Sequence, residues 1–203
     1  MAKNMLNMLK KNIGKYQKKQ DLELRVQPRA NKIRTSSKQI TALLRRNNIK
    51  QAKELFVEIT RDWRSINKAA NDSHDLLNLS CYKEAAEEYV EALAYWSFLA
   101  SVDLSIPEFV RVDTEEVISG ICDFTGELVR RAITEASAEN IDKIITYKKI
   151  TEDIVEELTK IRLGKKMRSK YDDAERNLKK LENVIYDIKM KMIRNRSEGG
   201  AGE

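Results

Sequence analysis

Residues 167–192, MRSKYDDAERNLKKLENVIYDIKMKM, have the clearest apolar periodicity in the chain. Its apolar side chains return at alternating steps of four and three positions, at Met167, Tyr171, Ala174, Leu178, Leu181, Ile185, Ile188 and Met192. Such a spacing follows one face of an α-helix over more than three heptads. The sequence therefore predicts a long final helix whose apolar seam closes the core of the domain or packs against another subunit.

The rest of the chain has the same helical character. Its 203 residues include only two prolines and seven glycines, and no alternating apolar run is bounded by turn residues. We predict an all-α, single-domain bundle of about seven helices over residues 1–196, with residues 1–20 as a basic accessory helix and residues 197–203 as a disordered tail. Pro28 should mark a helix start or a kink. Gly164 should stop the helix that begins near Asn140.

No segment is suited to a membrane. No stretch approaches about 18 uninterrupted apolar residues, and the basic N-terminus lacks the apolar length of a signal peptide. Cys81 and Cys122 have no motif spacing, so we expect free thiols in a reducing compartment. His74 is the only histidine and has no partner cluster, which favours a loop residue over a catalytic base. We expect a soluble, cytoplasmic protein with no membrane partner.

The net charge of +6 is divided unevenly along the sequence. Residues 1–50 carry fourteen Lys or Arg against two acidic residues, residues 51–160 carry twelve against twenty-three, and residues 161–203 carry twelve against seven. The three segments therefore have net charges of +12, −11 and +5. Basic ends around an acidic middle suit a protein that binds a polyanion and a cation. The alternative is that long solvated helices are simply rich in lysine.

Two acid couples interrupt otherwise apolar helical stretches, Glu88 with Glu91 and Asp123 with Glu127. Residues three or four apart share one face of a helix, so each couple can present two carboxylates together. If the two helices pack together, four carboxylates meet, and a cation would offset their repulsion. Oxygen-only ligands favour Mg²⁺ or Mn²⁺. The alternative is a solvated acidic face or a structural charge network.

Basic residues near these stretches are candidates for contacts with nucleic acid. Arg61 and Arg64 flank Trp63, and this mixture of charge and aromatic surface is one way to hold single strands. Arg130 and Arg131 follow the second acid couple by about one turn and would neutralise charge on a phosphate. The alternatives are that Trp63 belongs to the core and that the last two arginines are exposed helix-end cations.

Three blocks together resemble the translin family, and within it the catalytic branch of the translin-associated factor X proteins. They are Glu88-Tyr89-Val90-Glu91-Ala92, then Asp123-Phe124-Thr125-Gly126-Glu127-Leu128, and finally Lys179-Lys180-Leu181-Glu182-Asn183 with Tyr186 and Lys189. Weaker similarity lies at Ser37-Lys38, and the stretch Arg168–Asp172 is also similar to translin itself. The order and spacing of the blocks extend the resemblance over about residues 30–195. Leu77–Cys81 departs from it, because family members carry a basic aromatic segment there.

The resemblance implies a seven-helix protein that assembles into closed hollow oligomers, typically octamers, and binds single-stranded RNA or DNA. Its catalytic branch implies a metal-dependent endoribonuclease. We therefore expect a homo-oligomeric, single-stranded RNA-binding nuclease that uses Mg²⁺ or Mn²⁺ held by Glu88, Glu91, Asp123 and Glu127. Two alternatives stay open. One is a single-stranded RNA- or DNA-binding protein without nuclease activity, and the other is a helical oligomeric scaffold.

Overall fold

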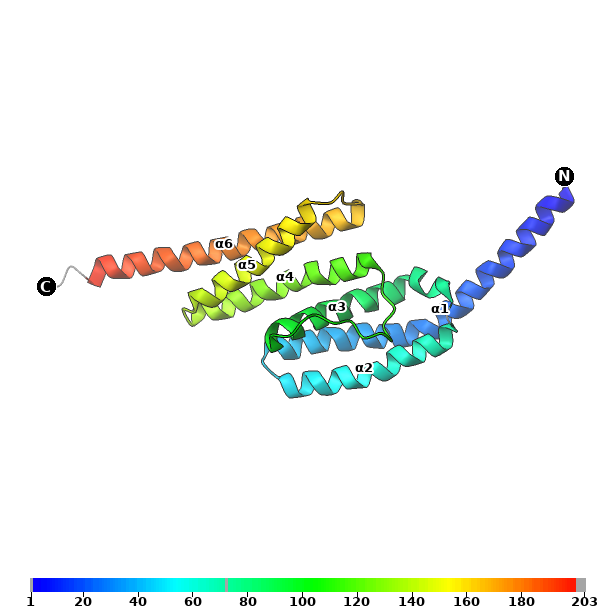
Figure 1. The fold of residues 1–203 in the computed structure, drawn as a ribbon, viewed down its shortest axis with the longest axis horizontal. Helices are drawn as coiled ribbons and strands as arrows, with labels where there is room; N and C mark the ends of the chain where they lie inside the picture. The colour runs from blue at the N-terminus through cyan, green and yellow to red at the C-terminus, as the bar shows by residue number, and fades with distance from the viewer. Residues whose placement is uncertain (1, 72, 200–203) are drawn as a thin grey trace. The chain divides into compact units, whose positions relative to one another are not determined.

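The computed structural model of the chain describes residues 2–71 and 73–199. These residues contain no strand, which confirms the all-α prediction. Residues 200–203 of the predicted tail lie outside the described residues, and residues 197–199 end the last helix. The described residues form six α-helices and one short 3-10 helix, in the order α1 (Ala2–Arg45), α2 (Ile49–Ala70), η1 (His74–Asn78), α3 (Ser80–Ala100), α4 (Thr114–Ser137), α5 (Ile141–Thr159) and α6 (Lys165–Gly199). The α-helices are labelled in Figure 1.

The described residues form six α-helices rather than about seven because the two expected N-terminal helices are one. α1 continues through Pro28, although proline removes a backbone donor and crowds the preceding turn. Leu22, Val26, Ala30 and Ile33 lie on both sides of the proline, at helical spacing, and each is at most 4% exposed. Burial of this stripe offsets the cost of the proline. α1 therefore does not begin at Pro28, and the described part of the predicted accessory helix is the first part of the same helix.

The helices group into two compact units, Met1–Val117 and Ile118–Glu203, with the border inside α4. In the first unit α1 packs against α2 and α3. Trp63 of α2 is fully buried, and its ring meets the rings of Tyr82 and Tyr89 edge to face, with centroids 5.4 and 5.5 Å apart. Trp63 is thus a core residue. The prediction of a single domain over residues 1–196 stays a prediction.

The second unit contains most of α4 together with α5 and α6, and α5 packs against α6. On α6 every seventh residue of the predicted seam is buried, and the exposed fraction of Met167, Ala174, Leu181 and Ile188 is at most 9%. The intervening Tyr171, Leu178 and Ile185 are half-buried, and Met192 is 36% exposed. The seam therefore closes a core along one edge and leaves its other edge partly open.

Asparagine residues terminate α2 at both ends, but the glycine expected to stop α5 does not lie at its end. The side chain of Asn48 caps α2, and Asn71 ends that helix in the left-handed conformation with φ 47°. Gly164 lies beyond the end of α5, because α5 already ends at Thr159. The Gly164 carbonyl instead accepts a hydrogen bond from the Arg168 N–H, 2.8 Å away, at the start of α6. His74 begins η1 rather than lying in a loop.

Two further expectations concern thiols and membranes. Cys81 and Cys122 are both free thiols, half-buried and buried respectively, as predicted. Among the helices that the structure describes, none has the length and apolar character needed to cross a membrane.

Candidate metal and nucleic-acid site

The first acid couple lies on α3, in the first unit. The Glu88 carboxylate is 22% exposed, and the Lys38 ammonium of α1 lies 2.8 Å from its Oε1 atom. One turn earlier on both helices, Arg34 pairs with Glu84 at 2.7 Å. The two pairs place cations of α1 opposite acids of α3, so Lys38 fixes the position of the Glu88 carboxylate at this helix contact. Glu91, one turn later, is half-buried.

Tyr89 anchors this couple in the core between the two glutamates. It is 2% exposed and packs edge to face on Trp63 and on Phe56, with centroids 5.5 and 5.9 Å apart. Burial raises the pKa of the Tyr89 hydroxyl from 10.0 to about 12. The neutral ring fixes the orientation of α3, so the neighbouring carboxylates are held by a rigid helix.

The second acid couple lies on α4, in the second unit. Lys170 of α6 donates to both oxygens of Asp123, at 2.8 Å for Oδ1 and 2.6 Å for Oδ2. The side chains of Lys170 and Asp123 are 19% and 30% exposed. Glu127 is only 2% exposed and pairs with the Arg130 guanidinium. Hydrogen bonds between charged groups are stronger than neutral ones, so both carboxylates are oriented by their cationic partners.

Close packing of α4 on α6 supports this arrangement. A methyl group added at Gly126 would lie 3.6 Å from Asn177 Nδ2, an ordinary van der Waals contact. The same Asn177 amide donates to the Thr125 hydroxyl at 2.9 Å. An alanine would therefore fit at this position, and the hydrogen bond between Asn177 and Thr125 is what joins the two helices here.

The four predicted metal ligands divide equally between the two units, and their convergence stays a prediction. Among the described residues, no group of three or more His, Cys, Asp or Glu is placed to hold a metal ion. Each couple supplies two carboxylates. The donor set nevertheless fits a hard divalent cation, since its atoms are all carboxylate oxygens. Asp123 and Glu88 also each already bind a cationic ammonium group.

The four predicted nucleic-acid residues have different surroundings. Arg61 and Arg64 are exposed on α2, and the Arg64 guanidinium lies 5.5 Å from the centroid of the Phe109 ring. Arg130 is 59% exposed while it pairs with Glu127. Arg131 is half-buried, and its Nε atom donates to the Tyr147 hydroxyl of α5 at 3.2 Å. Three of the four are thus accessible, and Arg131 also ties α4 to α5.

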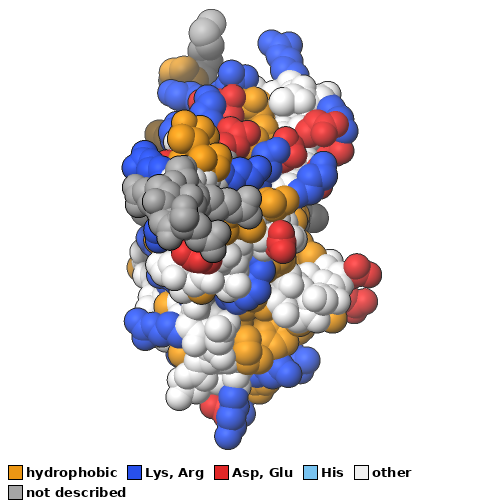
Figure 2. All heavy atoms as spheres, turned by 90° about the vertical axis from the view of Figure 1, so that its left-hand side faces the viewer, with side chains coloured by type: hydrophobic (Ala, Val, Ile, Leu, Met, Phe, Trp, Pro, Cys, Tyr) orange, Lys and Arg blue, Asp and Glu red, His pale blue; other side chains and the backbone are white. Residues whose placement is uncertain are grey.

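The charge segregation along the sequence does not produce a single-sign surface on the face shown in Figure 2. There, Lys and Arg side chains lie among Asp, Glu and hydrophobic side chains. Cross-helix pairing explains part of this mixture, because basic residues of α1 sit beside acidic residues of α2 and α3. Lys32 of α1, for example, lies 3.0 Å from both Glu58 and Asp62.

Sequence reasoning missed the two lysines that hold the acid couples. Lys170 lies 47 positions from Asp123, and nothing in their spacing pairs them. Weak signals did exist, because Lys38 and Lys170 both fall inside stretches that resemble the translin family. The pairing itself became visible only with the packing of α1 on α3 and of α6 on α4.

These observations define an all-α protein with a carboxylate couple on each of two helices, in which one acid of each couple is held by a lysine from a neighbouring helix. The Translin family model matches residues 21–192, and the chain belongs to the translin family. The family prediction is confirmed. Among curated proteins the chain is 25% identical to "Translin" of Gallus gallus over 92 residues, which is 45% of this chain and 40% of the chicken protein.

Solved structures share the fold. The chain superposes on "Crystal structure of apo-NeC3PO" with a TM-score of 0.74 and 24% identity, covering 89% of this chain and 96% of that one. It superposes on "Crystal structure of AfC3PO" with a TM-score of 0.66 and 19% identity, covering 93% and 98%. "Structure of AfC3PO - duplex RNA complex" gives a TM-score of 0.66 and 17% identity, with the same coverage.

Proposed function

We propose that the protein binds single-stranded RNA, and single-stranded DNA as a second ligand, and cleaves RNA with a bound Mg²⁺ or Mn²⁺. Membership of the translin family supports nucleic-acid binding, and one structural neighbour is described as a complex with duplex RNA. The net charge of +12 over the first fifty residues supports it independently. This proposal places the chain in the catalytic branch of its family, with the translin-associated factor X proteins.

The nuclease proposal rests mainly on one observation, that a lysine from a neighbouring helix binds one acid of each couple. Asp123 binds the Lys170 ammonium with both oxygens, and Glu88 binds Lys38 with one. A carboxylate that is half-buried and already oriented on a cation is prepared to accept a metal ion in its place. Glu91 and Glu127 lie one turn away on the same helices and would complete the oxygen set.

A bound divalent ion would polarise the scissile phosphate and lower the pKa of a bound water. The protein's residues have separate tasks. Glu88, Glu91, Asp123 and Glu127 would hold the ion, and Arg130 would turn from Glu127 toward a phosphate oxygen. Lys38 and Lys170 would release their carboxylates, and their ammonium groups would then face the anionic substrate as point charges.

A homo-oligomer, with an octamer favoured, is part of the proposal. Large apolar side chains remain exposed on the far part of α6, with Tyr186 at 62% and Ile193 at 58%. A second subunit would cover these side chains and the half-buried edge of the seam.

A specific observation favours a second candidate, an RNA-binding protein without nuclease activity. Glu88, Asp123 and Glu127 each pair with a Lys or Arg, which is also how a structural charge network is built. In that case the acids stabilise helix contacts and the basic residues bind RNA.

Purified protein incubated with end-labelled single-stranded RNA separates the two candidates. The nuclease proposal expects cleavage with Mg²⁺ or Mn²⁺ and none with a chelator. Binding that is equal with and without metal, and without any cleavage, would leave the second candidate. Absence of salt-sensitive binding would overturn both and leave a helical scaffold.

A further inference from the structure

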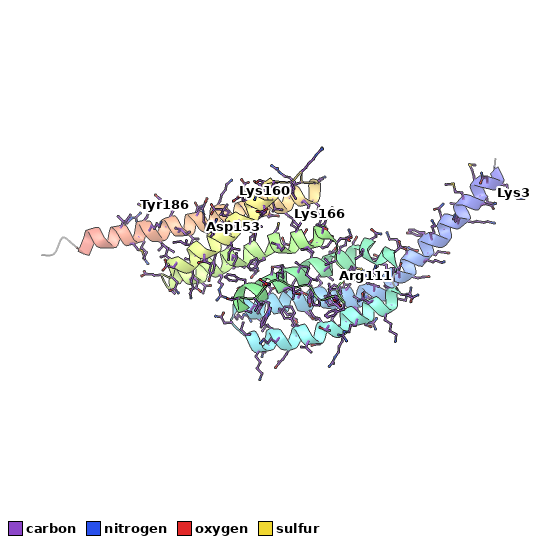
Figure 3. The ribbon with its side chains drawn as sticks, in the orientation of Figure 1. Lys3, Arg111, Asp153, Lys160, Lys166 and Tyr186 are labelled. Carbon is purple, nitrogen blue, oxygen red and sulfur yellow. The ribbon has the colours of Figure 1, made fainter. Side chains whose placement is uncertain are left out.

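The first part of α1 is a helix without a covering partner in its own unit. The apolar residues of its first 20 positions are 46–69% exposed, and they are Met5, Leu6, Met8, Leu9, Ile13 and Tyr16. Figure 1 shows this end of α1 reaching beyond α2 and α3, and Figure 3 marks Lys3 near its tip. Residues 3–20 extend roughly 27 Å at 1.5 Å per residue. An exposed apolar helix of this length requires an explanation.

Its two faces are sharply separated. With about 100° between successive residues, Met5, Leu6, Leu9, Ile13 and Tyr16 fall within an arc roughly 100° wide. The segment carries six lysines and no acidic residue, and the lysines centre on the opposite side, at Lys3, Lys10, Lys11, Lys15, Lys18 and Lys19. A merely solvated helix has no reason to sort its residues in this way.

The exposed stripe is not a continuation of the core stripe. Leu22, Val26, Ala30 and Ile33 face the core of the first unit. Along a regular helix their direction differs from that of the Leu6–Tyr16 stripe by roughly 110°. The N-terminal stripe therefore faces another direction than the side of α1 that α2 and α3 cover.

The second unit contains a complementary surface between α4 and α5. We call it the α4–α5 groove. It has a volume of about 340 Å³ and an apolar lining, with two carboxylates among the lining residues, which are Ile118, Ile121, Cys122, Asp153, Ile154, Glu157 and Leu158. Asp153, labelled on α5 in Figure 3, is 54% exposed, and Glu157 is 73% exposed. Their present partners are Lys149 of α5 and Lys160, the residue that caps the end of α5, and both are exposed and therefore replaceable at small cost.

We propose that residues 5–16 of α1 from one copy dock into the α4–α5 groove of a second copy. Leu6, Leu9 and Ile13 supply the i, i+3, i+7 ridge that helix-in-groove recognition uses. Lys10 and Lys19 flank the ridge on its two sides, where they meet the acidic residues of the groove. The inference rests on the proposed homo-oligomer, and it does not depend on RNA binding or on metal chemistry.

The contact is head to tail, because it joins two different surfaces of the chain. Repetition of such a contact around an axis closes a ring of subunits. The stiffness of α1 keeps the exposed segment away from the core of its own unit, since one helix joins that segment to the buried stripe that begins at Leu22, and the proposed homo-oligomer supplies the groove of a second copy. The segment therefore projects from its own unit instead of folding back on it.

Light scattering of the full chain at micromolar concentration provides the first test. Leu9→Glu with Ile13→Glu should lower the assembled mass at least twofold while helical content stays the same. Asn4→Glu with Asn7→Glu is the matched control, because it adds the same charge on the lysine face and should leave the mass unchanged. An unchanged mass for the apolar-face variant would overturn the proposal, as would an equal fall for the control.

A disulfide cross-link tests whether the segment occupies the α4–α5 groove and whether that groove belongs to the same copy or to a second one. In a Cys81→Ser, Cys122→Ala background, which removes the groove's own thiol, two chains are co-expressed and oxidised, one carrying Leu9→Cys and the other Ile154→Cys. The proposal expects a covalent dimer from this pair and only a trace from either chain alone. A chain carrying both cysteines that closes only an internal disulfide would show docking within one copy, and absence of any link would show a different surface. Either result overturns the proposal. If the wild-type chain is a monomer, the proposed oligomer fails as well, which light scattering reports separately.

Discussion

Replacement of Lys170 by methionine should strengthen metal binding at the second acid couple. The lysine is 19% exposed and contacts both oxygens of Asp123, at 2.6 and 2.8 Å. Exposed ion pairs contribute up to about 1 kcal/mol, and loss of one partner of a buried pair costs about 3–5 kcal/mol. The half-buried pair of Lys170 and Asp123 lies between these limits, so the lysine should weaken the free energy of metal binding by about 1–2 kcal/mol. That corresponds to a roughly tenfold gain in affinity when the lysine is removed.

In the assay, Mn²⁺ is titrated into the RNA-free protein, and electron paramagnetic resonance measures the concentration of the free ion. Lys179→Met is the matched control, since this lysine also lies on α6 but is 66% exposed and sits 3.8 Å from Glu175. The control should bind Mn²⁺ like the wild type. Equal affinity for the wild type and the Lys170 variant would refute the competition argument, and no binding by any of the three proteins would refute the metal site itself.

Three further predictions address binding and stability. RNA affinity should fall steeply between low and physiological salt in a filter-binding assay, because phosphate contacts release counterions; a flat response would leave the basic residues as solvating groups. The wild type should lose about 2–3 kcal/mol of stability between pH 10 and 12, because the raised pKa keeps the folded Tyr89 hydroxyl protonated while the unfolded one ionises. Tyr89→Phe should remove this loss. Urea unfolding of both proteins at pH 8 and 11.5 measures it, and an equal loss in the variant would contradict the assignment. Leu181→Ala should destabilise the fold by about 2–5 kcal/mol, since Leu181 is fully buried in the α6 seam; a loss below 1 kcal/mol in the same assay would mean that the seam is not a core.

Much of the fold could be predicted from the sequence because the helices carry strong local signals. The four-and-three spacing from Met167 to Met192 predicts α6, and its every-seventh positions are the buried ones. Pro28 shows the limit of local rules. Proline disfavours a helix interior, but the tertiary burial of Leu22 and Val26 on one side and of Ala30 and Ile33 on the other outweighs it.

The candidate site could be predicted only in part. The i, i+3 and i, i+4 spacings place each acid couple on one helix face, which local geometry is sufficient to predict. The lysines that bind these acids depend on which helices pack together, and the spacing of residues in the sequence does not predict that. Lys170 and Lys38 therefore appear only in the structure, although both change what the carboxylates do.

Metal-dependent cleavage of single-stranded RNA by the four carboxylates can be tested by comparing the wild-type protein with a single variant. Wild-type protein and the Asp123→Asn variant are incubated with labelled single-stranded RNA in Mn²⁺, and RNA binding and assembled mass are measured in parallel. The substitution keeps the shape of the side chain but removes a ligand charge. The account predicts cleavage by the wild type, none by the variant, and unchanged binding and mass for both. Cleavage by the variant at the wild-type rate would contradict it, and so would wild-type cleavage that persists after the metal is chelated.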